Sequence, residues 1–182
     1  MTLANKILAV LFSLITIVLF VFNKEITILL FLIYIIFPFI IKLKPSYTLI
    51  YLVFGFLSIL LGFLIHLYKT IYWYDSFVHF IWGFVASILA IIIIKKLKMY
   101  NDKNILFNII FIVLFSISLS CLWEVAEFTL DNIFKSDMQR RLTGVYDTMK
   151  DIIVAILGNI LFVIWYFYEY KCKSLKKYTD LL

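Results

Sequence analysis

Charged residues are scarce in this sequence, and their scarcity excludes most soluble architectures. Only 15% of the 182 residues are charged, whereas 65% are hydrophobic and 19% are aromatic. A soluble domain of this size has too small an interior to bury so much apolar surface. The apolar runs also have bilayer length, because about 20 helical residues cross about 30 Å of hydrocarbon. The composition therefore predicts an integral membrane protein surrounded by the lipid bilayer.

Other absences narrow the class further. The chain has two cysteines, Cys121 and Cys172, which the predicted topology puts on opposite sides of the membrane, so no disulfide between them is expected. The first apolar run ends without a small-x-small cleavage site, which predicts a retained span instead of a secretory signal. Despite a net charge of +6, the lysines stand in short flanks beside apolar runs. This pattern is typical of topology signals, and no nucleic-acid partner is expected.

The apolar runs predict an all-α fold, a polytopic transmembrane helix bundle of about six spans in a single domain, residues 1–182. The expected spans are residues 5–22, 26–41, 47–68, 76–94, 105–130 and 147–168. Only three residues join the first two, so a re-entrant pair is the alternative there. Eleven Lys and Arg residues flank one predicted face and five flank the other. By the positive-inside rule, both termini are expected in the cytoplasm.

The acidic residues gather on the face that the lysines avoid. Seven of the eleven Asp and Glu residues belong to the connections between spans three and four and between spans five and six, or to the adjoining span ends. At 100° per residue, six of these acids, together with one histidine and two glycines, form one stripe on each of three helices. The stripes are Asp75, His79 and Gly83; Glu124, Glu127 and Asp131; and Asp147, Asp151 and Gly158. Because a charge facing lipid costs on the order of 3 kcal/mol, the stripes are expected to face an interior that opens outward.

Several of these residues also have a purely structural explanation. Asp75 and Asp147 open their helices and can serve as N-caps. His79 can be a buried imidazole that is hydrogen-bonded to Asp75. Arg140, Arg141 and Lys150 can neutralise the acids through packing salt bridges. The two glycines of the stripes would let the helices approach closely.

Glu124 and Glu127 resist a structural explanation best, because two carboxylates one turn apart at a helix C-terminus repel each other and oppose the helix dipole. An arginine or a metal ion is expected to compensate them. The candidate metal ligands are Asp75, His79, Glu124, Glu127, Asp147 and Asp151. Of these, His79, Glu124 and Asp151 are the candidate catalytic groups. Carboxylates with one imidazole suit a divalent metal ion such as Mg²⁺, Mn²⁺ or Zn²⁺.

Three segments of the chain resemble a known family. "YDSFVHFIWG", "WEVAEF" and "QRRLTGVYDTMKDIIVAILGN" are similar to the YjdF-type family of uncharacterised bacterial inner-membrane proteins and, more distantly, to VanZ-like membrane proteins. The matching positions are Asp75, His79, Gly83, Glu124, Glu127, Gln139, Asp147, Asp151 and Gly158. The resemblance covers about residues 70–160. It implies a location in the bacterial cytoplasmic (inner) membrane and supports the site, but it implies no particular reaction.

Three functions remain open at this point. The first is a metal-dependent hydrolase or transferase that acts on a lipid or cell-envelope precursor, although the chain has no HExxH motif and no nucleophile elbow. The second is a carrier in which the carboxylates bind a cation or a small ligand. The third is a structural or accessory membrane protein whose polar cluster fixes helix packing. The oligomeric state cannot be read from the sequence.

Overall fold

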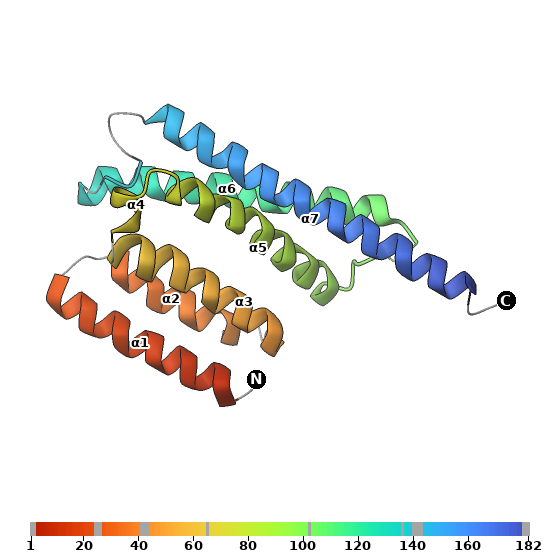
Figure 1. The fold of residues 1–182 in the computed structure, drawn as a ribbon, viewed down its shortest axis with the longest axis horizontal. Helices are drawn as coiled ribbons and strands as arrows, with labels where there is room; N and C mark the ends of the chain where they lie inside the picture. The colour runs from red at the N-terminus through yellow and green to blue at the C-terminus, as the bar shows by residue number, and fades with distance from the viewer. Residues whose placement is uncertain are drawn as a thin grey trace. The chain divides into compact units, whose positions relative to one another are not determined.

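In the computed structural model, every secondary-structure element among the described residues is a helix (Figure 1). The structure describes residues 3–23, 27–40, 44–64, 66–101, 103–135, 137–139 and 144–179. The chain divides into two compact units, Met1–Val78 and His79–Leu182. The boundary between the units falls inside the unbroken helix α5 (Tyr74–Lys96). The predicted all-α class is confirmed.

The first unit packs its helices around a small apolar core. Its elements are α1 (Leu3–Asn23), α2 (Thr27–Ile40), α3 (Pro45–Gly55), the π-helix η1 (Phe56–Leu64) and α4 (Leu67–Thr70). The buried core residues are Ala9, Phe12, Ile35, Leu52 and Ile59. They come from α1, α2, α3 and η1, so one cluster of hydrocarbon holds these elements together.

Local sequence explains where two of these helices begin. Pro45 stands at the start of α3, where its fixed φ suits the helix and its missing N–H would have had no helical partner. Its carbonyl accepts a hydrogen bond from the Asn5 side chain at 2.9 Å, which ties α1 to the start of α3. His66 has a left-handed φ of 58° and precedes α4. The predicted span 47–68 is therefore interrupted near its end.

The second unit consists of α5, α6 (Ile105–Phe134) and α7 (Val145–Thr179), which Figure 1 shows running alongside one another. Asn104 caps α6, because its side chain accepts a hydrogen bond from the Phe107 backbone N–H at 3.3 Å. Lys135, with a left-handed φ of 57°, ends that helix. The buried apolar core of this unit is Ala90, Ile112, Phe162 and Tyr166. All three helices contribute to this core.

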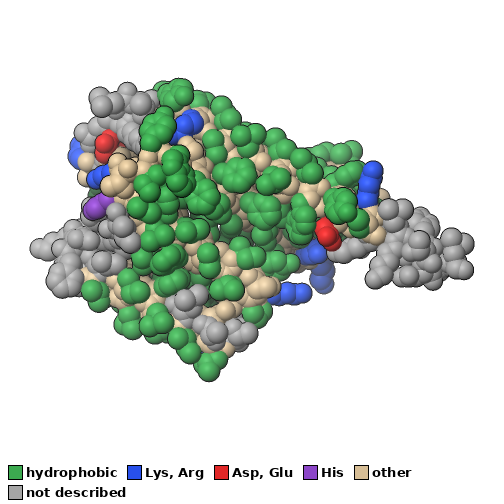
Figure 2. All heavy atoms as spheres, in the orientation of Figure 1, with side chains coloured by type: hydrophobic (Ala, Val, Ile, Leu, Met, Phe, Trp, Pro, Cys, Tyr) green, Lys and Arg blue, Asp and Glu red, His purple; other side chains and the backbone are tan. Residues whose placement is uncertain are grey.

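Four helical stretches in the described part of the chain are long and apolar enough to cross a membrane. They are Pro45–Gly62, Tyr74–Lys96, Ile105–Phe134 and Val145–Cys172. The apolar run Asn5–Val18 of α1 is shorter, and α2 has only 14 residues. Hydrophobic side chains cover most of the face drawn in Figure 2. Large hydrophobic residues are widely exposed in the described part of the chain, and Leu122 and Ile164 are each 61% exposed. A surface of this kind requires lipid around it, whereas the count of six spans stays a prediction.

Helices α5 and α7 touch backbone to backbone at two glycines. A Cβ atom added at Gly83 would overlap the carbonyl oxygen of Ala155, and one added at Gly158 would overlap the carbonyl oxygen of Phe80. The absence of a side chain at both positions is what permits this approach. Each of the two glycines predicted to allow close packing therefore lies against the backbone of the other helix, Gly83 at Ala155 and Gly158 at Phe80.

A line of buried hydroxyl and amide groups joins the three helices beside this crossing. The Asn159 side-chain amide donates to Ser87 Oγ at 2.7 Å. The hydroxyls of Ser87 and Ser116 both donate to the Gly83 carbonyl, at 2.6 and 3.1 Å. Ser120 donates to the Ser116 carbonyl at 3.1 Å. Because unpaired polar groups are costly in hydrocarbon, these bonds hold the three helices in one register.

The crossing makes a testable prediction. Replacing Gly83 or Gly158 with alanine should lower the stability of the protein by about 1–3 kcal/mol, because the added methyl group must push two backbones apart. Thermal unfolding of the protein in detergent would measure the change. Val125→Ile is the matched control, since it adds one methyl group at a position of α6 that is 60% exposed. Equal melting temperatures for Gly83→Ala and Val125→Ile would contradict the prediction.

Candidate metal centre

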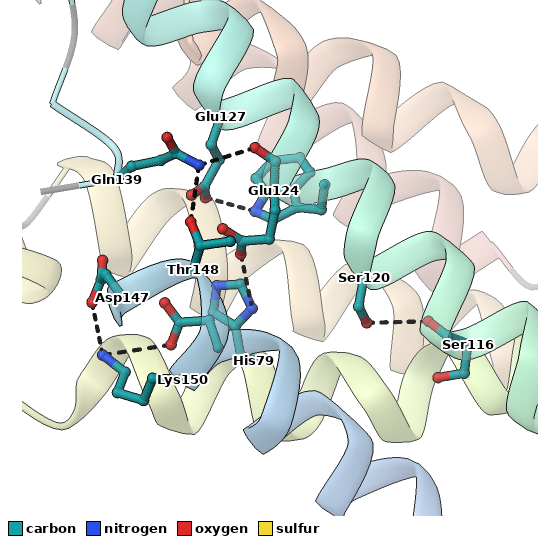
Figure 3. A network of polar contacts seen from close by, with 11 residues as sticks. His79, Ser116, Ser120, Glu124, Glu127, Gln139, Asp147, Thr148 and Lys150 are labelled. Atoms are coloured by element: carbon teal, nitrogen blue, oxygen red, sulfur yellow. Dashed lines mark hydrogen bonds and ion pairs between the residues drawn. The ribbon is translucent and has the colours of Figure 1, made fainter. Parts of the chain in front are cut away.

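The ionisable residues singled out by the sequence lie where three helix ends meet (Figure 3). Asp75 stands in the first turn of α5, and Asp147 stands in the first turn of α7. Helices α5 and α7 are parallel, as the Ser87–Asn159 bond shows together with the glycine crossing. Helix α6 runs the opposite way, so its later turns, which carry Glu124, lie beside the first turns of the other two helices.

Asp75, His79 and Asp151 form the centre of this cluster. One ligand atom from each of the three residues lies within 4.8 Å of the other two. Asp75 and His79 share a face of α5 because they are four residues apart. Atoms that bind one ion at 2.0–2.6 Å lie up to about 5 Å apart, so this spacing suits a common ion. In the described ranges, this is the group of His, Cys, Asp and Glu side chains that meets the spacing.

Glu124 approaches the group of three from α6. Its Oε1 atom lies 3.9 Å from Nδ1 of His79, and only 5% of the residue is exposed. His79 is similarly buried, with 6% exposed. A carboxylate beside an imidazole nitrogen can orient the ring and favour one tautomer, as carboxylates do beside metal-binding histidines. Glu124 is therefore placed either to orient His79 or to accept a proton near it.

Lys150 brings a positive charge to the acids of α7. Its Nζ atom lies 2.8 Å from Oδ1 of Asp147 and 3.6 Å from Oδ1 of Asp151. The two carboxylate side chains are almost completely buried, whereas 22% of the lysine side chain is exposed. One lysine thus contacts both acids of the predicted α7 stripe. The lysine charge therefore partly compensates the negative charge of these two buried carboxylates.

The segment after α6 is anchored to the same cluster through Asp131. The two carboxylate oxygens of Asp131 accept hydrogen bonds from the backbone N–H groups of Met138 and Gln139, at 2.9 and 3.0 Å. The Gln139 side-chain amide donates to the Glu124 carbonyl at 3.2 Å and to Thr148 Oγ1 at 3.0 Å. Gln139 therefore links α6 to α7 beside the group of three.

The remaining predicted residues have other surroundings. Glu127 accepts a hydrogen bond from the indole N–H of Trp123 at 2.7 Å and is not part of the group of three. The two glycines of the predicted stripes form the helix crossing described above. Arg140 and Arg141 lie outside the described residues. The stripe predicted on α6 thus divides, because Glu124 faces His79 whereas Asp131 binds backbone.

Trp123 and Thr148 belong to this network although the sequence did not single them out. Trp123 stands one turn before Glu127, a spacing that indicates a same-face contact on a helix. That signal was available in the sequence. Thr148 is bound by Gln139, which lies across a connection between two helices, and helical periodicity cannot predict such a partner.

The chain is similar to proteins whose descriptions state no activity. A family described as "Predicted membrane protein (DUF2238)" matches residues 2–171. A protein of Thermotoga maritima (strain MSB8), described as "Uncharacterized protein", is 30% identical over 103 residues, 57% of this chain and 52% of the relative. The match thus spans about half the length of that relative, and no solved structure matches. Because the family match covers nearly all of the chain, the protein belongs to the DUF2238 family of predicted membrane proteins.

Proposed function

We propose that this protein binds a divalent metal ion in the membrane and uses it to act on a lipid or cell-envelope precursor. The observation that carries the proposal is the group of Asp75, His79 and Asp151, with ligand atoms within 4.8 Å of one another. Two carboxylates and one imidazole suit Mn²⁺ or Zn²⁺ better than Mg²⁺, which prefers oxygen ligands and retains several waters. The proposed ligands are therefore these three residues, with the ion's other positions left for water and substrate.

The neighbouring residues support hydrolysis or group transfer as the reaction. A divalent ion held here would polarise a substrate oxygen and activate a water molecule. Glu124, 3.9 Å from His79, is the proposed general base, because it is a carboxylate beside the ligand group and not a member of it. Gln139 and Thr148 would keep α6 and α7 together around the reacting groups.

The exposed aromatic residues before α5 support a lipid-borne substrate. Tyr72 is 81% exposed and Trp73 is 60% exposed, and both stand within three residues of Asp75. Exposed tyrosine and tryptophan at the end of an apolar helix are typical of the membrane–water interface. The group of three would then lie about one helical turn below that level, within reach of a lipid headgroup.

A structural role is the second candidate, and specific contacts favour it. Gln139 is bonded to α6 and α7, and the Asn159 amide of α7 donates to Ser87 of α5. Bonds of this kind hold membrane helices together without any ligand. A purely structural cluster would contain no stoichiometric metal, and its variants would be unstable instead of inactive.

Metal content separates the two candidates. By inductively coupled plasma mass spectrometry, the purified protein is expected to contain about one Mn²⁺ or Zn²⁺ ion per chain. His79→Asn should lose this ion while remaining folded. The reason is that the substitution removes a ligand atom from a group of three. Added metal should also raise the melting temperature of the wild type and not that of His79→Asn.

The chain offers a matched control, because it has two histidines. His66 is exposed and adopts a left-handed conformation that asparagine tolerates, so His66→Asn should keep the full metal content. A wild type without metal, together with His79 variants that fail to fold, would exclude the metal proposal in favour of packing.

The proposed topology has six spans in one domain, with both termini in the cytoplasm of a bacterium. The lysine distribution and the YjdF-type resemblance support it, and the parallel arrangement of α5 and α7 agrees with it. Reporter fusions at Asp137 and after residue 180 should therefore report opposite sides of the membrane. A cytoplasmic signal from the Asp137 fusion would overturn the outward orientation of the site.

A further inference from the structure

Lys150 is the part of the cluster that a metal-binding role does not explain. Its ammonium group lies 3.6 Å from Asp151, one of the three proposed ligands, and 2.8 Å from Asp147. A divalent ion beside Asp151 would therefore stand within a few ångströms of a second positive charge. This repulsion should weaken binding of the metal alone by about tenfold or more, even if water screens it well.

Asp147 keeps this lysine at the side of the proposed metal position. The shorter of the two ion pairs is the one to Asp147, whose side chain is 6% exposed. The lysine side chain is more exposed than either of its partners. The ammonium group is therefore held in the cluster, while part of the lysine side chain reaches the surface.

Two positive charges side by side make a site for an anion. Carboxylates surround the proposed ion on α5, α6 and α7, and they would repel an anionic ligand from the site. A metal ion together with the Lys150 ammonium group can reverse that field locally, since each can bind a different oxygen of one phosphate group. Phosphate is also the anionic group that phospholipids present at the membrane interface.

We propose that Lys150 and the metal ion together bind a phosphate group of the substrate. This inference rests on the proposed metal site, and it narrows the substrate to a phosphate ester or a phosphate-bearing lipid. Because Lys150 repels the metal and attracts the anion, metal and phosphate should each strengthen the binding of the other. Reciprocal strengthening of this kind is the signature that a packing lysine would not produce.

The test measures Mn²⁺ binding to the detergent-solubilised full chain by titration calorimetry, with and without inorganic phosphate. Phosphate should strengthen Mn²⁺ binding to the wild type about tenfold. Lys150→Met should bind Mn²⁺ about tenfold more tightly than the wild type without phosphate, and phosphate should strengthen its affinity much less, because only the metal then holds the anion. Removing the single positive charge of Lys150 should thus strengthen metal binding and weaken the response to phosphate.

Two further variants control the experiment. Lys150→Arg keeps the charge and should retain both the weaker metal binding and the response to phosphate. Lys69→Met removes an exposed lysine from α4 and should behave like the wild type. If Lys150→Met does not fold, Lys150→Gln replaces it, and circular dichroism with size-exclusion chromatography establishes that each variant is folded.

A second series identifies the source of the phosphate group. Short-chain phosphatidic acid should strengthen Mn²⁺ binding more than inorganic phosphate does if a lipid is the substrate, whereas equal effects would assign the site to a soluble phosphate. Equal Mn²⁺ affinities of wild type and Lys150→Met, with no phosphate response in either, would overturn this inference and leave the metal site intact. Absence of Mn²⁺ binding in both would instead refute the metal site on which the inference rests.

Discussion

The second unit depends on the backbone contact between α5 and α7 at Gly83 and Gly158. Without side chains at these positions, the two parallel helices approach closely and keep a constant register, in which residues 72 apart in sequence stand side by side. The same register brings Asp151 to the level of His79. The glycines lie one to two turns away from these residues, yet they decide whether the proposed ligand atoms can meet.

Polar side chains in a membrane helix are costly, and this unit confines them to its interior. The buried stripe of α6 contains Asn108, Ile112, Ser116, Ser120 and Glu124, one residue per turn. Ser116 and Ser120 donate hydrogen bonds to backbone carbonyls next to the glycine crossing. The apolar cluster around Ile112 separates these serines from a second polar pair, in which the Asn108 amide donates to the Tyr166 hydroxyl. His79, Glu124, Asp147 and Asp151 are thus gathered at one end of the three helices.

Helical periodicity was enough to predict much of the candidate site. A spacing of four residues places Asp75 with His79, and Asp147 with Asp151, on single helix faces, and the cost of charge in lipid turns those faces inward. The same rule failed to separate Glu124 from Glu127 on α6. Their surroundings differ because Trp123, a residue without charge, binds Glu127, whereas Glu124 faces His79.

The sequence by itself determined that this protein lies in a membrane and that three of its helices carry polar stripes, because composition and periodicity are properties of single segments. Only the tertiary structure decided which stripes meet and at what level. It brought Glu124 of α6 to His79 of α5, and it linked Gln139 to both α6 and α7. Such partners depend on the rotation and register of neighbouring helices, which contacts between helices set and no single segment encodes.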